Sequence, residues 1–114
     1  MEIDKLFGGV YKNKKVLITG HNGFKGSWLT YWLNEMEADI TGISLENEAE
    51  QSHFSLINTS CKTITQDITE RKGITKAIQD ADPEIIFHLA AQALVRDSYT
   101  NPYDTYMTNV MGTI

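Results

Sequence analysis

Cysteine and long hydrophobic runs are scarce in this sequence, and each shortage excludes a class of protein. Cys61 is the only cysteine among 114 residues, so no internal disulfide and no cluster of thiolate metal ligands can form. No motif around it indicates a nucleophile, and we predict no metal site. No stretch approaches the ~20 apolar residues that span a bilayer, and charges at Glu2, Asp4 and Lys5 argue against a signal peptide. The expected location is the cytoplasm, with no membrane partner.

Basic residues are also in the minority. Lys and Arg number 10 against 15 Asp and Glu, which gives a formal net charge of -5. Because binding along a nucleic-acid backbone calls for clustered cations, this balance argues against a duplex nucleic acid partner. Hydrophobic residues make up 41% of the sequence, enough for one core. We expect residues 1–114 to form a single unit without repeats or linkers.

What the sequence does have is a glycine-rich turn between an apolar run and an amphipathic segment. The run over 15–19 ends at Gly20, and Gly23 and Gly26 follow at three-residue intervals. We predict that Gly20 lets a strand turn sharply, that Gly23 lets backbone N–H groups approach phosphate oxygens, and that Gly26 lets a helix pack closely. The helix would aim its unpaired N–H groups and positive dipole end at an anion. The pattern predicts a site for a dinucleotide pyrophosphate; the alternative is a glycine turn without a ligand.

Apolar runs and amphipathic segments alternate along the rest of the sequence, which predicts a parallel sheet. Strands are expected at 15–19, 39–45, 62–66 and 84–89, and helices at 23–37 and 69–80, the second capped by Thr69. A last helix is expected near Pro102 with Asn101 as its cap, a helical turn within 3–11, and a polar loop with an apolar piece at 54–57. Right-handed crossovers give the strand order 3-2-1-4, so the fold class is α/β, a partial Rossmann-type doubly wound parallel sheet. Ligands bind such sheets at the carboxyl ends of strands 1 and 4.

Residue spacing predicts which side chains are buried. One face of the helix over 23–37 is expected to carry Phe24, Trp28, Leu29, Trp32, Leu33 and Met36. The buried face of the helix over 69–80 is expected to carry Ile74, Ala77, Ile78 and Ala81. The unbroken apolar centre of the strand over 84–89, residues 85–87, is typical of a strand buried on both faces. Leu6 and Phe7 are expected to pack against the domain.

Small and polar residues at the predicted strand ends are candidates for binding a dinucleotide. After the fourth strand, Leu89, Ala90, Ala91 and Gln92 could line a nicotinamide ribose, although the two alanines could equally pack under a helix. His88 is interpreted as a hydrogen-bonded strand-end histidine rather than a catalyst. After the third strand, Asp67 and Ile68 could meet an adenine ring, or Asp67 could be an ordinary acid near a helix N-terminus.

The end of the second strand bears on the choice between NAD and NADP. An acidic residue that binds the adenosine ribose is expected ~20 residues past the glycines. Ser44 occupies the strand end here, and Glu46 follows two residues later. No Lys or Arg lies between residues 26 and 61, so a 2′-phosphate would lack a cationic partner. The sequence favours NAD.

Three segments together resemble the extended short-chain dehydrogenase/reductase family, also described as the NAD-dependent epimerase/dehydratase family: TGHNGFKGSWL at 19–29, FHLAAQALVRDSY at 87–99 and NPYDTYMTNVMGT at 101–113. The resemblance is specific to its nucleotide-sugar 4,6-dehydratase branch, a group of lyases. It implies an enzyme that holds NAD and removes water internally from the hexose of a nucleotide sugar. It also implies cofactor-binding roles for Gly20, Asn22, Gly23, Phe24, Lys25, Gly26, Ser44, Asp67, Ile68, Leu89, Ala90, Ala91, Gln92, Thr108 and Asn109.

The family's catalytic residues are missing from this sequence. Its Tyr-x-x-x-Lys pair and its acid and base carboxylates would lie further along; Tyr11 and Lys15 have the spacing but precede the cleft. We therefore expect the amino-terminal, cofactor-binding portion of an enzyme, without the substrate-binding portion or turnover of its own, and a homo-oligomer. The alternatives are an epimerase or reductase of the same family, or a non-catalytic dinucleotide-binding module.

Overall fold

A parallel sheet forms the centre of the computed structural model, which describes residues 3–21, 23–45, 61–91 and 95–114. Its order is β3-β2-β1-β4, with β1 at Lys15–Thr19, β2 at Asp39–Ser44, β3 at Lys62–Thr65 and β4 at Ile85–His88. All three strand pairings are parallel, and Thr19 is the register partner of both Ile43 and His88. The predicted fold class and strand order are confirmed.

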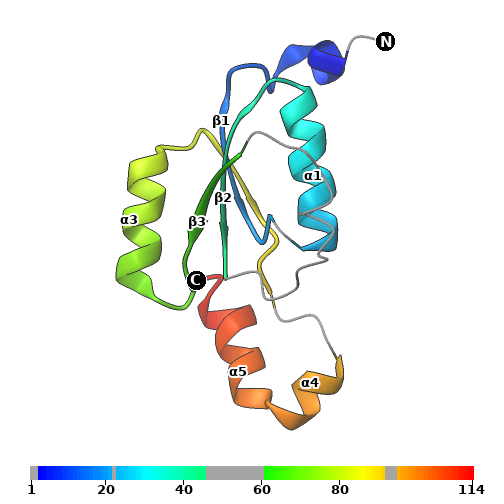
Figure 1. Cartoon of the computed structure of the whole chain (residues 1–114). Coiled ribbons are helices and arrows are strands. Elements are labelled where there is room, and N and C mark those ends of the chain that lie inside the picture. Colours follow the sequence, from blue (N-terminus) through cyan, green and yellow to red (C-terminus); the bar gives the residue numbers. More distant parts are fainter. Residues whose placement is uncertain (1–2, 22, 46–60, 92–94) are drawn as a thin grey trace.

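Helices α1 (Phe24–Glu35) and α3 (Arg71–Ala81) cover opposite faces of the sheet (Figure 1). Successive residues of β1 point to opposite faces, so Val16 and Ile18 pack with Leu33 of α1 and with Met36, its C-cap, whereas Leu17 packs with Ala77 of α3. The predicted buried face of α3 is confirmed: Ala77 is buried, and its three expected partners pack against the same cluster, namely Ile74, Ile78 and Ala81. Because all four strands are parallel, their carboxyl ends lie at the same edge of the sheet, between the layers of α1 and α3.

The prediction for α1 is wrong in one respect. Leu33 and Met36 are buried, but Trp28 and Trp32 are about half exposed, at 52% and 51%. The face that meets the sheet carries the fully buried Ser27 and Thr30 instead. Small side chains on that face let the helix approach closely, so the bulky indoles are turned outward.

Strand β4 also departs from expectation, because Ile86 is 50% exposed. Ile85 and Phe87 pack into the cluster on the α1 face, but Ile86 points to the other face, where α3 packs on β1. In the part of the chain that the structure describes, β4 is an edge strand with one neighbour, β1. A strand in this position is buried on one face only.

The remaining elements lie at the two ends of the sheet. A 3-10 segment (Ile3–Gly9) precedes β1 at the amino end; Leu6 packs against the core, whereas Phe7 is exposed and only stacks edge-on with Tyr11. Helices α4 (Val95–Thr100) and α5 (Pro102–Tyr106) and a π-helical turn, η2 (Met107–Met111), lie beyond the carboxyl ends of the strands (Figure 1). Helix α4 was not predicted from the sequence.

Two predicted caps differ from the structure. Glu70 rather than Thr69 is the N-cap of α3, because Thr69 uses both its N–H and its hydroxyl to bind Asp67. Asn101 occupies the N-cap position of α5, as predicted, and Pro102 begins the helix, but the Asn101 side chain makes no capping bond. Residues 46–60, with the expected apolar piece at 54–57, lie outside the described residues. Within the described ranges, no helix has the length and apolar character needed to cross a bilayer.

Candidate functional site

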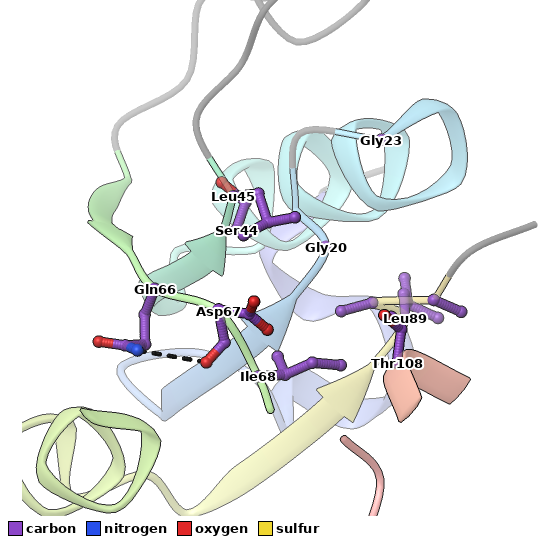
Figure 2. A pocket seen from close by; sticks show the side chains of 11 residues that line it. Gly20, Gly23, Ser44, Leu45, Gln66, Asp67, Ile68, Leu89 and Thr108 are labelled. Atoms are coloured by element: carbon purple, nitrogen blue, oxygen red, sulfur yellow. Dashed lines mark hydrogen bonds between the residues drawn. The ribbon is translucent and has the colours of Figure 1, made fainter. Parts of the chain in front are cut away.

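A cavity of about 330 Å³ opens at the carboxyl ends of the four strands, between the start of α1 and the turn η2. Figure 2 shows its lining from close by. Nine predicted site residues line it: Gly20, Gly23, Ser44, Asp67, Ile68, Leu89, Ala90, Ala91 and Thr108. These residues come from five separate segments, and the topology brings them together where the strand order reverses, as predicted for this fold.

The glycine turn has the geometry that its sequence predicts. Gly20 has φ +76°, and a Cβ atom there would lie 2.8 Å from the main-chain nitrogen of Ala90. Only glycine satisfies both demands, since other residues rarely adopt this conformation. The turn therefore lets β1 reverse while it touches the segment that leaves β4.

Gly23 and Gly26 have different neighbours. A Cβ atom on Gly26 would overlap the carbonyl oxygen of Gly20, so the helix packs against the turn itself. On Gly23, which is the N-cap of α1, the nearest atom to a Cβ would be the same oxygen at 3.4 Å. Gly23 lines the cavity, whereas Gly26 is buried beneath it.

The start of α1 carries partial positive charge. Its first turn contains no acidic residue and its N-cap has no side-chain hydrogen bond. The N–H groups of the first turn have no partner within an α-helix, and they add to the positive end of the helix dipole. Lys25 is exposed in this turn and does not line the cavity. An anion is the ligand that this end of the cavity favours.

Asp67 is held in a fixed turn on the opposite side. Its Oδ1 atom accepts hydrogen bonds from the Thr69 N–H at 2.9 Å and the Thr69 hydroxyl at 2.7 Å. Gln66, beside it, donates to the main-chain oxygen of Asp67 at 3.2 Å and to Glu70 at 3.0 Å. Asp67 thus orders the turn before α3 and also lines the cavity.

Two lining residues, Leu45 and Gln66, were not predicted. Each is the immediate neighbour of a predicted residue at a strand end, Ser44 or Asp67. The signal was their position after a parallel strand, since every residue there lies at the same edge of the sheet. Ser44 itself is buried, and its carbonyl oxygen accepts a bond from the Gln66 N–H at 2.8 Å.

The segment that leaves β4 forms the third wall. The hydroxyl of Thr19 accepts bonds from the N–H groups of Leu89 at 3.1 Å and Ala90 at 3.2 Å, and it lies 2.6 Å from Nδ1 of His88. Leu89 and Ala91 are exposed and Ala90 is partly exposed, so the alanines line the cavity rather than lying under a helix. His88 is hydrogen-bonded at the strand end, as predicted.

The turn η2 closes this side of the cavity. Thr108 lines it, while its neighbour Asn109 does not and instead offers its main-chain oxygen to the Thr113 hydroxyl at 2.7 Å. Gly112 brings the turn against Ile68, because a Cβ atom there would lie 2.6 Å from the Ile68 Cδ1 atom. The end of the chain therefore contacts the residues that follow β3.

His21, to which the sequence analysis gave no role, lies fully buried under the glycine turn. Its ring packs so tightly against Gly42 of β2 that a Cβ there would overlap it, and Nε2 lies 3.4 Å from the Thr63 hydroxyl. Burial lowers the pKa of His21 below its ordinary 6.5, an effect that a hydrogen bond with the Ile43 main chain partly offsets. Its place between two motif glycines was the available signal.

Cys61 is a poor candidate for chemistry. Burial raises the pKa of its thiol to about 11, although hydrogen bonds with the Gly42 main chain and the Thr63 side chain act the other way. Its sulfur donates a long bond to the Lys62 carbonyl, 3.5 Å. Since the thiolate is the reactive form, a thiol with a raised pKa should react slowly near neutral pH.

Other predicted residues lie away from the cavity or outside the described ranges. Asn22 and Gln92 lie outside the described residues, and Phe24 is described in its backbone alone. Lys15 is the first residue of β1 and so lies at the amino end of the sheet, opposite the cavity, and Tyr11 before it contacts the ring of Phe87. Their spacing is therefore a coincidence, as expected.

A family model and a curated relative both match this chain, and both are described as 4,6-dehydratases. Residues 17–114 match the model of the family described as GDP-mannose 4,6 dehydratase. A curated relative, CDP-glucose 4,6-dehydratase of Salmonella typhimurium, is 45% identical over 114 residues, which cover 98% of this chain and 31% of the relative.

Solved structures agree on the fold. An epimerase from Methanothermobacter thermautotrophicus superposes with a TM-score of 0.78 at 26% identity, over 97% of this chain and 31% of that one. The UDP-glucose 4-epimerase of Brucella ovis, solved in complex with NAD, gives 0.71 at 26% identity, over 86% and 29%. The chain spans about a third of the length of these proteins.

Proposed function

The chain belongs to the GDP-mannose 4,6-dehydratase family, a branch of the extended short-chain dehydrogenases/reductases, and from this membership we propose that it is the NAD-binding portion of a nucleotide-sugar 4,6-dehydratase. The sequence resemblance to that family is thereby confirmed. For the substrate we propose CDP-glucose, supported by the 45% identity to a CDP-glucose 4,6-dehydratase. The substrate-binding portion lies outside residues 1–114 in this proposal.

The observation that carries the proposal is the cavity between the start of α1 and the segment that leaves β4. A dinucleotide has a diphosphate in its middle and an aromatic ring at each end. The start of the helix, where backbone N–H groups have no partner within a helix, lies beside Gly23, which has no side chain to obstruct an anion. Gly20 and the first residues of α1, namely Phe24, Lys25 and Gly26, would hold the diphosphate through main-chain groups.

The two ends of the cavity suit the two nucleosides. Asp67 presents a carboxylate, an acceptor for an exocyclic amine, beside the apolar surface of Ile68. At the other end Leu89, Ala90 and Ala91 form a wall of small and apolar side chains that faces Thr108. NAD supplies a nicotinamide ring that accepts and returns a hydride when bound; the residues of this chain bind it, orient it and keep water from its faces.

NAD binding by the full chain tests the proposal. Isothermal titration with NAD should show one site, and Gly23→Ala should weaken it while the fold is retained. Turnover of CDP-glucose is not expected, because no family Tyr-x-x-x-Lys pair lies at the cavity. Absence of NAD binding, or tighter binding of NADP, would contradict the proposal.

A second candidate is a nucleotide-sugar epimerase of the same family. The structural likeness to two epimerases supports it. The residues of the described cavity serve either reaction, since both need the dinucleotide held in the same way. Product analysis on the longer protein separates them: a dehydratase releases a 4-keto-6-deoxy sugar, and an epimerase returns an isomer of the substrate.

We further propose that the protein is a homo-oligomer and that it is located in the cytoplasm.

A further inference from the structure

We propose that Thr19, His88 and Thr113 form a directional hydrogen-bond network that positions the cavity wall at Leu89 and Ala90, with His88 as its central positioning residue. The proposal rests on the proposed function, because this wall is the one assigned there to the cofactor. It goes further in giving a role to three residues that do not line the cavity.

The direction of the first bond follows from the partners of Thr19. Its side chain is buried, at 5% exposure, and its hydroxyl has one proton to donate and two lone pairs. Ala90 donates its N–H to this oxygen, and Leu89 shares its N–H between this oxygen and the Thr19 carbonyl at 3.0 Å. Both of these partners are donors, so the hydroxyl proton points at Nδ1 of His88, 2.6 Å away.

The tautomer of His88 is fixed by this bond. Because Nδ1 accepts from Thr19, the ring proton of neutral His88 lies on Nε2. Nε2 is 3.1 Å from the hydroxyl oxygen of Thr113. That hydroxyl donates its own proton to the main-chain oxygen of Asn109, 2.7 Å away, and therefore accepts a hydrogen bond from Nε2. Every donor in the network meets an acceptor in one consistent direction.

The network joins three separate parts of the chain. Thr19 ends β1 directly before the glycine turn, His88 ends β4, and Thr113 follows η2, which carries Thr108 into the cavity. A displacement of η2 would pull on the His88 ring and loosen its bond to Thr19. The N–H groups of Leu89 and Ala90 are already bonded within this network. A ligand would therefore meet the remaining groups of this wall, and the network would hold them in a fixed position.

The test uses the full chain and exposed Thr113, where substitution leaves the core intact. Nitrogen-15 NMR should show the Nε2–H tautomer of His88. In Thr113→Val, hydrogen exchange at the Ala90 amide should accelerate roughly fivefold, as expected for the loss of one supporting hydrogen bond, and Thr113→Ser should restore it. Thr105→Val is the matched control, since the Thr105 hydroxyl also bonds a carbonyl four residues earlier, that of Asn101 at 3.0 Å, whereas the hydroxyl that meets His88 is that of Thr113.

The outcomes separate this proposal from the proposed function. An Nδ1–H tautomer, or Ala90 exchange that is the same in Thr113→Val and Thr105→Val, overturns the network whether or not NAD binds. The expected NMR results without NAD binding would leave the network standing and overturn the cofactor assignment. If both are right, Thr113→Val also weakens NAD binding roughly fivefold, and Thr105→Val does not.

Discussion

Gly26 packs its Cα atom against the carbonyl oxygen of Gly20, so closely that a Cβ atom would overlap it, whereas Gly23 beside it has room for one. The two glycines of the helix start therefore differ in what they make possible. Gly26 lets α1 close on the turn. Gly23 keeps the mouth of the cavity free of a side chain.

Alanine at these two positions should separate folding from binding. Gly26→Ala forces backbone apart, and we expect a loss of roughly 1–3 kcal/mol in the free energy of unfolding. Gly23→Ala meets only one oxygen at 3.4 Å and should cost about 1 kcal/mol or less. Its methyl group would nevertheless weaken NAD binding by about tenfold or more. Urea unfolding and isothermal titration measure the two effects; equal losses of stability would contradict the distinction.

NAD should bind more tightly than NADP. Asp67 is the one charged side chain among the described residues that line the cavity, so a 2′-phosphate gains no cationic partner and meets a carboxylate's repulsion. Leu45, at the end of β2, lines the cavity and is exposed. Leu45→Arg should raise NADP affinity roughly tenfold through a charge-assisted bond. Leu45→Gln, without the charge, is its control; tighter NADP binding by the unchanged protein would refute the argument.

The stability of the fold should fall in mild acid because of His21. Its pKa is lowered in the folded state below the ordinary 6.5, so the unfolded chain binds a proton first as the pH drops. The stabilisation is therefore complete above pH 6.5 and is lost as the pH falls towards the folded-state pKa. Urea unfolding between about pH 5 and 8 measures it. His21→Asn should flatten this part of the profile, and a profile that this substitution leaves unchanged would contradict the argument.

Cys61 should react slowly with thiol reagents. Raising its pKa from 9.0 to about 11 lowers the thiolate population near neutral pH roughly a hundredfold. Labelling by a disulfide reagent should be slow in the native chain and fast in denaturant. Rapid native labelling would contradict a raised pKa of the thiol.

The edge strand β4 should make the 114-residue chain self-associate. Ile86 is half exposed on a strand with one described neighbour, and such apolar edges pair with other copies. Light scattering should show a mass that rises with concentration, and Ile86→Lys should reduce it. A monodisperse monomer that converts CDP-glucose would contradict both this prediction and the assignment as a cofactor-binding portion.

The larger part of the fold was predictable because its signals are local. An apolar run that ends at Gly20 gives a strand and a turn, and the spacing of Ile74, Ala77 and Ile78 gives the buried face of α3. The error at α1 has a tertiary cause. Trp28 and Trp32 share the period of buried residues, but the small residues Ser27 and Thr30 lie against the sheet instead. Small side chains let the helix pack closer to the sheet than the two indoles would allow.

The sequence by itself determined the glycine turn, the alternation of strands and helices, and hence the edge of the sheet where ligands bind, because each depends on neighbouring residues and on the handedness of crossovers. Only the tertiary structure decided that Gly26 serves packing and Gly23 the cavity, that His21 is buried against Gly42, and that Thr19, His88 and Thr113 meet. Those relationships join residues up to 94 positions apart in a chain of 114, and no local pattern encodes the angle at which distant backbone segments come together.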